Sequence, residues 1–285
     1  MPTIAANGLD FYYELWGEGP PLVMAHGFCG CTDEWRALVL PLAKRRRLLL
    51  YDVRGHGRSS APEDPALYSM PIFAADQAAL MRALGVHRAH VGGISMGGMI
   101  AAQFAVDYPQ MLSSLLLCDT TCGNGSDRGP AGQFESFLAE ALTQMEDVAA
   151  KSGFPELARR ELEWSQKNDP HFDDRPEPEE VGLRRLEQMR LPGYVGANRA
   201  IRQRPDLLGK VGEVRAPTLV LVGEWDDFLP CSRLAHERIG GSRLALIERS
   251  HHGTPIWRPE GFRKAILGFL DDVHEGRPVT AELRY

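Results

Sequence analysis

Residues 90–105 read HVGGISMGGMIAAQFA, and this stretch decides the fold. An apolar segment typical of a buried strand runs into the turn Gly93-Ile94-Ser95-Met96-Gly97, and an apolar helix pattern follows at once. A strand, a sharp turn and a helix in this order form a nucleophile elbow, which exposes its serine at the tip of the turn. Glycines on both sides of the serine allow a strained turn and a closely packed helix. We therefore predict that Ser95 is a nucleophile.

Two later segments supply the partners that such a serine needs. A serine hydroxyl is a weak nucleophile at neutral pH and requires a base, which in turn requires a group that fixes its tautomer. Asp226 follows the apolar run 218–222, and the pair His251 and His252 follows the apolar run 244–247. Both sites come at the carboxyl ends of expected strands, where open α/β sheets place their active sites. One histidine of this pair is the expected base.

The alternation of short apolar stretches with longer amphipathic ones predicts an α/β fold, with a mostly parallel central sheet and helices on both faces. The expected strands are 9–16, 22–25, 48–52, 89–92, 114–119, 218–222 and 244–247. The expected helices begin near residue 32 and cover about 72–84, 96–107 and 259–274.

The alternation stops between residues 120 and 217. Helix-forming segments at 134–150, 155–167 and 178–189 follow one another there without a strand, and the polar stretch 168–178 predicts a loop between them. We expect a core made of residues 1–119 and 218–285, with residues 120–217 inserted as a helical cap. A second domain unrelated to catalysis is the alternative.

Composition excludes several classes of function. The net charge of −6 argues against a surface that binds nucleic acid, and no apolar run reaches the ~18 residues of a membrane span. The first 25 residues contain no Lys or Arg, so a signal peptide is not expected. A small-molecule substrate is the expected partner.

The cysteines and glycines predict neither a metal nor a cofactor. Five cysteines, an odd number in a chain of 285 residues, favour reduced thiols and a cytoplasmic location. Cys29 and Cys31 have no second pair to complete a zinc site. The sequence also lacks the glycine-rich motifs that bind dinucleotides or nucleotide phosphates after a strand.

Several segments resemble the α/β-hydrolase superfamily, and the resemblance extends over nearly the whole chain outside the cap. Residues 26–30, HGFCG, resemble its oxyanion loop, and residues 51–59, YDVRGHGRS, resemble its D-x-R-G-H-G-x-S turn. Residues 223–230 fit G-x-x-D-x-x-x-P, which assigns the acid of the triad to Asp226. The resemblance implies an α/β-hydrolase fold with an inserted helical cap.

The same resemblance assigns the remaining roles. The family has a Pro about seven residues after its catalytic His, and counting back from Pro259 gives His252. His251 stands where the family usually has Gly and stays open as the alternative base, as Asp119 does for the acid. The family builds its oxyanion hole from two backbone N–H groups, which here are those of Phe28 and Met96.

The expected activity is hydrolysis of a carboxylic ester or a lactone through a Ser-His-Asp triad and an acyl-enzyme. Relatives that resemble dehalogenases or epoxide hydrolases carry Asp where this chain has Ser95, so those activities are not expected. The alternatives are hydrolysis of a carbon–carbon bond in a diketone-like substrate and, from another class, ligand binding without catalysis. Trp225, Phe228 and Trp257 are the expected pocket residues for a small, largely apolar substrate.

Overall fold

The computed structural model describes residues 2–123, 125, 129–174, 185–186 and 188–285. Its centre is a nine-stranded sheet in the order β1-β2-β4-β3-β5-β6-β7-β8-β9. β2 pairs antiparallel with β1 and β4, and every other pair is parallel. The strands are β1 Thr3–Ala6, β2 Leu9–Trp16, β3 Pro21–Ala25, β4 Arg47–Tyr51, β5 Ala89–Ile94, β6 Leu112–Cys118, β7 Thr218–Gly223, β8 Arg243–Ile247 and β9 Ala281–Arg284.

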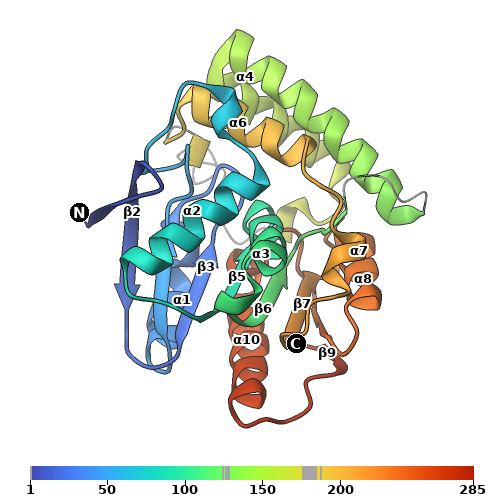
Figure 1. Ribbon diagram of the computed structural model, residues 1–285. Coiled ribbons are helices and arrows are strands. Elements are labelled where there is room, and N and C mark those ends of the chain that lie inside the picture. The colour runs from blue at the N-terminus through green and yellow to red at the C-terminus, as the bar shows by residue number, and fades with distance from the viewer. Residues whose placement is uncertain (1, 124, 126–128, 175–184, 187) are drawn as a thin grey trace.

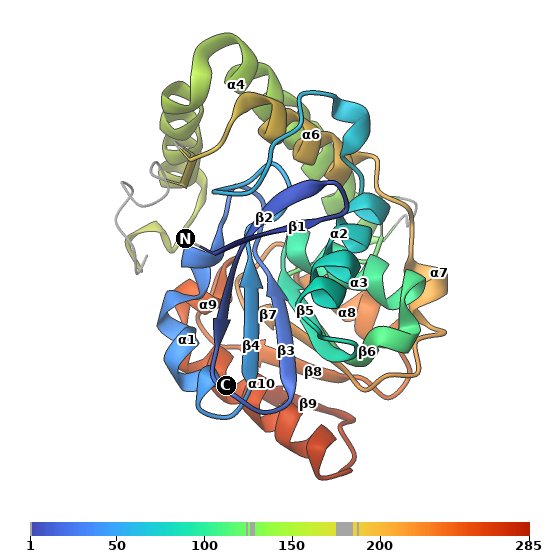
Figure 2. The same cartoon turned by 60° about the vertical axis from the view of Figure 1, so that its left-hand side comes forward.

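Helices cover both faces of the sheet because alternate residues of a strand point to opposite sides. Val23 and Ala25 of β3 belong to the apolar cluster beneath α2 and α3, whereas Leu22 and Met24 belong to the cluster beneath α1 and α10. Figures 1 and 2 show these two layers. The helices are α1 Arg36–Ala43, α2 Met70–Ala83, α3 Met96–Asp107, α7 Leu208–Val211, α8 Leu229–Arg238, α9 Thr254–Trp257 and α10 Pro259–His274.

Two further helices, α4 (Pro130–Asn168) and α6 (Leu191–Arg202), lie between β6 and β7 in the chain, and we call them the cap. Figure 1 shows them together over the carboxyl ends of the parallel strands. Ion pairs from Glu146 to Arg199 and Arg202 join the two helices, as does the hydrogen bond from Asn198 Nδ2 to the Leu142 carbonyl. The cap therefore covers the end of the sheet at which Ser95 lies.

α4 consists of two helical parts, because Gly153 between them has non-helical backbone angles, φ 81° and ψ 173°. Its two parts match the expected helices 134–150 and 155–167, while most of the expected helix 178–189 lies outside the described residues. α4 carries many charged residues, such as Arg159, Arg160 and Glu163. Among the described residues, no helix is both long enough and apolar enough to cross a membrane.

All seven expected strands are present, with ends that differ by no more than two residues from the expected ones. β1 and β9 were not predicted, and neither was α6. β1 and β9 are four-residue edge strands, and three of the four residues of β9 are exposed, so no apolar alternation marks them. In α6, Gly193 and Gly196 weaken the helix signal.

Candidate active site

Ser95 occupies the turn between β5 and α3 in a strained conformation, with φ 55° and ψ −118°. A positive φ is uncommon for a residue with a side chain and costs about 1–3 kcal/mol. Backbone contacts hold the turn: the Ser95 N–H donates to the Cys118 carbonyl at 2.9 Å, and Thr120 Oγ1 donates to the Ser95 carbonyl at 2.7 Å. The surrounding fold therefore enforces the elbow geometry that the glycine pattern predicted.

The glycines of the elbow allow α3 to approach the sheet. A Cβ added to Gly97 would overlap the carbonyl oxygen of Ala25 in β3, and a Cβ added to Gly93 would overlap the carbonyl group of Gly97. Both obstacles are backbone atoms, which cannot rotate away. The N-terminus of α3 consequently sits directly against the ends of β3 and β5.

Asp226 and His252 are brought together by the loops after β7 and β8. His252 Nδ1 lies 3.1 Å from Asp226 Oδ2 and 3.2 Å from Oδ1. The Phe228 N–H also donates to Asp226 Oδ1 at 2.9 Å, and the Phe228 ring stacks on the imidazole with 4.7 Å between ring centroids. With Nδ1 bound to the carboxylate, Nε2 is the nitrogen of His252 that can accept a further proton.

Opposing effects set the pKa of His252. Burial favours the neutral imidazole, but the charge of Asp226 and the hydrogen bond to it outweigh burial and raise the pKa to about 9. The side chain of His252 is 41% exposed, and it lines the cavity described below. This arrangement stabilises the protonated imidazole that forms when a base takes a proton from serine.

Asp119 lies beneath both loops and does not contact His252 directly. Its carboxylate accepts N–H groups from Gly223 at 3.2 Å, Gly253 at 3.2 Å and Thr254 at 2.8 Å. Burial, followed by the nearby charge of Asp226, raises the pKa of Asp119 to about 7. These contacts fit a residue that positions the loops and place Asp226, not Asp119, against His252.

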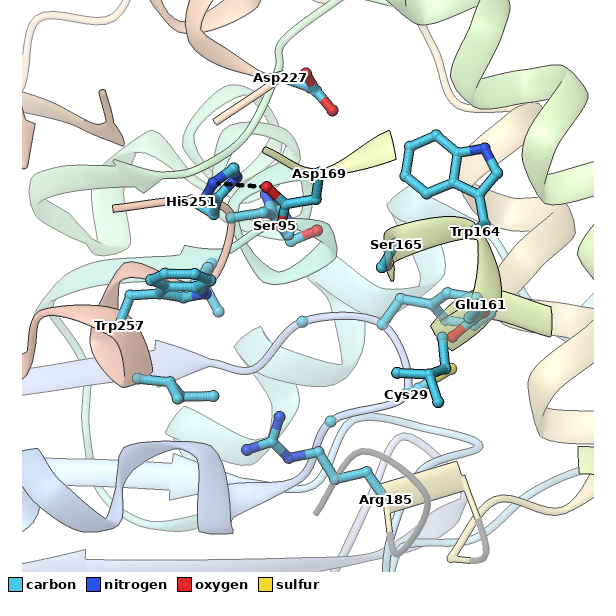
Figure 3. Close-up of a pocket in the computed structure, with 18 of the residues that line it drawn as sticks. Cys29, Ser95, Glu161, Trp164, Ser165, Asp169, Arg185, Asp227, His251 and Trp257 are labelled. Atoms are coloured by element: carbon cyan, nitrogen blue, oxygen red, sulfur yellow. Dashed lines mark ion pairs between the residues drawn. The ribbon is translucent and has the colours of Figure 1, made fainter. Parts of the chain in front are cut away.

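His251 points to a different partner from its neighbour. Its Nε2 lies 3.3 Å from Asp169 Oδ1, a contact drawn in Figure 3 that is an ion pair only when His251 is protonated. The ring packs between Trp225 and Trp257, with centroids 5.4 and 4.9 Å away. The contacts to Asp226 therefore single out His252, while His251 connects the core to the loop after α4.

A cavity of about 780 Å³ lies between the end of the sheet and the cap (Figure 3). Its lining from the core includes Phe28, Glu34, Ser95, Trp225, His252 and Trp257. Its lining from α4 includes Ala158, Glu161, Leu162, Trp164, Ser165 and Asn168. Ser95 and His252 thus open into the same space, although no direct hydrogen bond joins their side chains.

The remaining predicted residues have different positions. Trp225 and Trp257 line the cavity as expected. Phe228 does not: it is buried behind the His252 ring, because its backbone N–H is bound to Asp226. Phe28 lines the cavity beside Ser95. Met96 is fully buried, and as the first residue of α3 its N–H has no carbonyl partner within the helix.

Sequence reasoning missed the carboxylates of the cavity wall, among them Glu34 and Glu161. Glu34 Oε2 accepts the Gly27 N–H at 2.8 Å, next to the backbone of Phe28. Glu161 lies on the cap side, with Trp164 and Ser165. The spacing of three and four residues along 158–168 would have predicted one shared helix face, but the sequence does not indicate what that face meets.

Comparison with known proteins agrees with this architecture. A family model described as "alpha/beta hydrolase fold" matches residues 20–169, more than half of the chain. The chain is similar to a putative carbamate hydrolase, RutD, of Azorhizobium caulinodans, with 26% identity over 96% of this chain and 100% of that protein.

Two solved structures show the same likeness. The enol-lactonase from Burkholderia xenovorans LB400 has a TM-score of 0.78 and 25% identity, covering 95% of this chain and 100% of that one. A thermophilic esterase from Thermogutta terrifontis has a TM-score of 0.79 and 27% identity, covering 95% and 97%. The family match, the sheet order and the elbow agree: this chain belongs to the α/β-hydrolase fold family and is a hydrolase.

Proposed function

We propose that the protein hydrolyses carboxylic esters or lactones of small molecules, with Ser95 as nucleophile, His252 as general base and Asp226 as the acid that orients His252. One observation carries the proposal. The strained Ser95 turn opens into the same cavity as His252, whose Nδ1 is bound by the buried Asp226 carboxylate.

The proposed reaction has two halves. Ser95 Oγ attacks the carbonyl carbon while His252 Nε2 takes the hydroxyl proton, and the N–H groups of Phe28 and Met96 hold the oxyanion. Collapse of the tetrahedral intermediate breaks the bond to the leaving oxygen, which receives the proton from His252. Water then attacks the acyl-enzyme with His252 as base, which releases the acid and restores Ser95.

The choice of esters and lactones is supported by the similar proteins. The relatives at 25–27% identity are named as an enol-lactonase, an esterase and a putative carbamate hydrolase, all of which cleave a bond between a carbonyl carbon and a heteroatom. The five cysteines are all free, which supports a cytoplasmic location as part of the proposal. A small molecule is the proposed partner because the cavity between the sheet and the cap has a volume of about 780 Å³.

The test is labelling of the purified protein with a fluorophosphonate probe, followed by mass spectrometry of the peptides. We expect the adduct on Ser95, because an activated serine reacts with such probes and a resting serine does not. His252→Ala should slow the labelling by at least about 100-fold, the usual scale of a general base.

Ser152→Ala is the control, since Ser152 is an exposed serine of α4 that does not line the cavity. That variant should be labelled at the wild-type rate. A folded protein that stays unlabelled at Ser95, or one labelled equally well in His252→Ala, would refute the proposed function.

A further inference from the structure

One face of α4 lines the cavity with polar side chains and a tryptophan, of which Trp164 and Asn168 are also exposed to solvent. Glu161, Trp164, Ser165 and Asn168 recur at intervals of three or four residues, so they share one side of the helix. All four line the cavity, with Ala158 one turn earlier. A cap that served only to exclude water would need an apolar face here. This face carries a carboxylate, a hydroxyl and an amide.

Glu161 differs from the other glutamates of the same helix because it has no partner. Glu146 pairs with Arg199 and Arg202, Glu156 with Arg159 and Arg160, and Glu163 with Arg159. Among the described residues, no hydrogen bond or ion pair reaches the carboxylate of Glu161. Glu161 is only partly exposed, so burial penalises its unpaired charge and a cationic ligand would relieve that penalty.

The surroundings of Glu161 also indicate that its carboxylate lacks a partner among the described residues. Burial raises its pKa to about 7, and no cation among the described residues acts to lower it. Figure 3 shows the carboxylate at the cavity wall beside Cys29, and the charge of Glu161, after burial, raises the pKa of that thiol. Neither a thiol nor an apolar neighbour can neutralise it.

The rest of the cavity favours a positive charge. Trp164, Trp225 and Trp257 all line it, and indole faces attract cations more strongly than other aromatic rings do. Among the described residues, one guanidinium lines the cavity, that of Arg185. Four carboxylates line it, namely those of Glu34, Glu161, Asp169 and Asp227. Even with His252 protonated, these four carboxylates outnumber Arg185 and His252 together.

We propose that Glu161 binds an ammonium group of the substrate, so that the preferred esters or lactones carry a protonated amine remote from the scissile bond. The inference rests on the proposed function for the reaction but not for the binding. Trp164, one turn further along α4, would contact the same group through its ring. This assigns a substrate class that neither the triad nor the fold specifies.

Matched esters test the proposal, because they differ only in an ammonium group and a methyl group. For a charge on the acyl side, the pair is methyl 6-aminohexanoate and methyl heptanoate. For a charge on the alcohol side, the pair is 5-aminopentyl acetate and hexyl acetate. Hydrolysis at neutral pH gives kcat/KM for each ester, and the ratio of ammonium to methyl ester is the readout.

In at least one pair, the wild-type protein should prefer the ammonium ester, and Glu161→Gln should lower the ratio by roughly 10- to 100-fold, the scale of a hydrogen bond to a charged group. Glu163→Gln removes the same charge from the exposed side of α4 and should leave the ratio unchanged. A wild-type ratio of one or less in both pairs, or an unchanged ratio in Glu161→Gln, overturns the proposal.

Binding to Ser95→Ala separates this inference from the proposed reaction. Calorimetry with the same esters should show tighter binding of the ammonium ester to Ser95→Ala than to the double variant with Glu161→Gln. If wild-type protein hydrolyses none of the esters but this preference holds, the proposed function fails and the ammonium site stands. If hydrolysis proceeds and the preference is absent, only the ammonium site fails.

Discussion

The two walls of the cavity differ in how their polar groups are satisfied. On the core wall, which we define as the residues that follow β5, β6, β7 and β8, Asp226 is bound by His252, and Asp119 accepts three backbone N–H groups. On the cap wall, the face of α4 from Ala158 to Asn168, Glu161 has no partner among the described residues, and Trp164 is 52% exposed.

This difference separates chemistry from recognition. Groups that act on every substrate must be held in place before the substrate arrives, since preorganised dipoles need no rearrangement during the reaction. Groups that select a substrate gain most when the substrate supplies their missing partner, because an analogue without that partner leaves them unsatisfied. Changes on the core wall should therefore lower activity or stability whatever the ester, and changes on the cap wall should alter the choice of ester.

The largest effect should come from Asp226→Asn. The amide cannot stabilise a protonated imidazole and can favour the wrong tautomer of His252, so kcat should fall by about 10³- to 10⁴-fold with any ester. Steady-state kinetics with p-nitrophenyl butyrate measures this loss. Circular dichroism should show an unchanged fold, because an asparagine can still accept the Phe228 N–H.

Asp227→Asn is the matched control, since the same charge is removed from the next residue of the same loop. Asp227 lines the cavity but has no hydrogen bond to His252. Its kcat should fall by less than about tenfold. Equal losses of kcat in Asp226→Asn and Asp227→Asn would show that the negative charge of the loop matters and that the specific pair of Asp226 and His252 does not.

The second effect concerns the rigidity of the core wall. Gly97→Ala places a methyl group on the carbonyl oxygen of Ala25, so it should lower the free energy of unfolding by at least about 3 kcal/mol. Urea unfolding followed by tryptophan fluorescence gives the value. If Gly97→Ala unfolded at the same urea concentration as the wild type, α3 would be able to shift away from the sheet. The elbow would then not be rigidly held by its packing.

Gly268→Ala serves as the reference for that measurement. Gly268 lies within α10, and a Cβ there would meet no heavy atom within 4 Å. The substitution should stabilise the protein by about 0.5–1 kcal/mol, because alanine is the better helix former.

The two walls also differ in how much of their structure the sequence could predict. The elbow followed from a local pattern of glycines around Ser95, whereas the choice of Asp226 and of His252 over His251 rested on the resemblance to the family's motifs. The edge strands β1 and β9 were missed because each has only four residues, too few to give a clear periodic signal. They form because the sheet next to them offers free backbone groups.

The cap wall could not have been predicted in the same way. Glu156 has Arg159 and Arg160 three and four residues further along its own helix, so the sequence indicates those ion pairs. Only the packing of α4 shows that Glu146 pairs with arginines of α6 while Glu161 meets the cavity. Phe228 was misplaced for a similar reason: its neighbours in the sequence line the cavity, but its own ring turns inward against His252.

The smallest effect should be on the pH dependence of stability. His252 on the core wall and Glu161 on the cap wall both have a raised pKa, but for different reasons. The pKa of His252 is raised from 6.5 to about 9 because burial, which lowers it, is outweighed by the partner Asp226. This pair therefore contributes stability that is full below pH 6.5 and is lost as the pH rises through about 9. The pKa of Glu161 is raised from 4.5 to about 7 because it lacks a partner.

For Glu161 the folded protein also binds more protons than the unfolded chain, so stability again falls with rising pH, but between 4.5 and about 7. Partial exposure limits each decline to about 1 kcal/mol. Urea unfolding across both ranges should show that Glu161→Gln flattens only the lower decline and His252→Gln only the upper one. An ammonium ligand should likewise flatten the lower decline, because it supplies the partner that the cap wall lacks. If both variants flattened the same range, the two walls would form one electrostatic unit, and the division between chemistry and recognition would not hold.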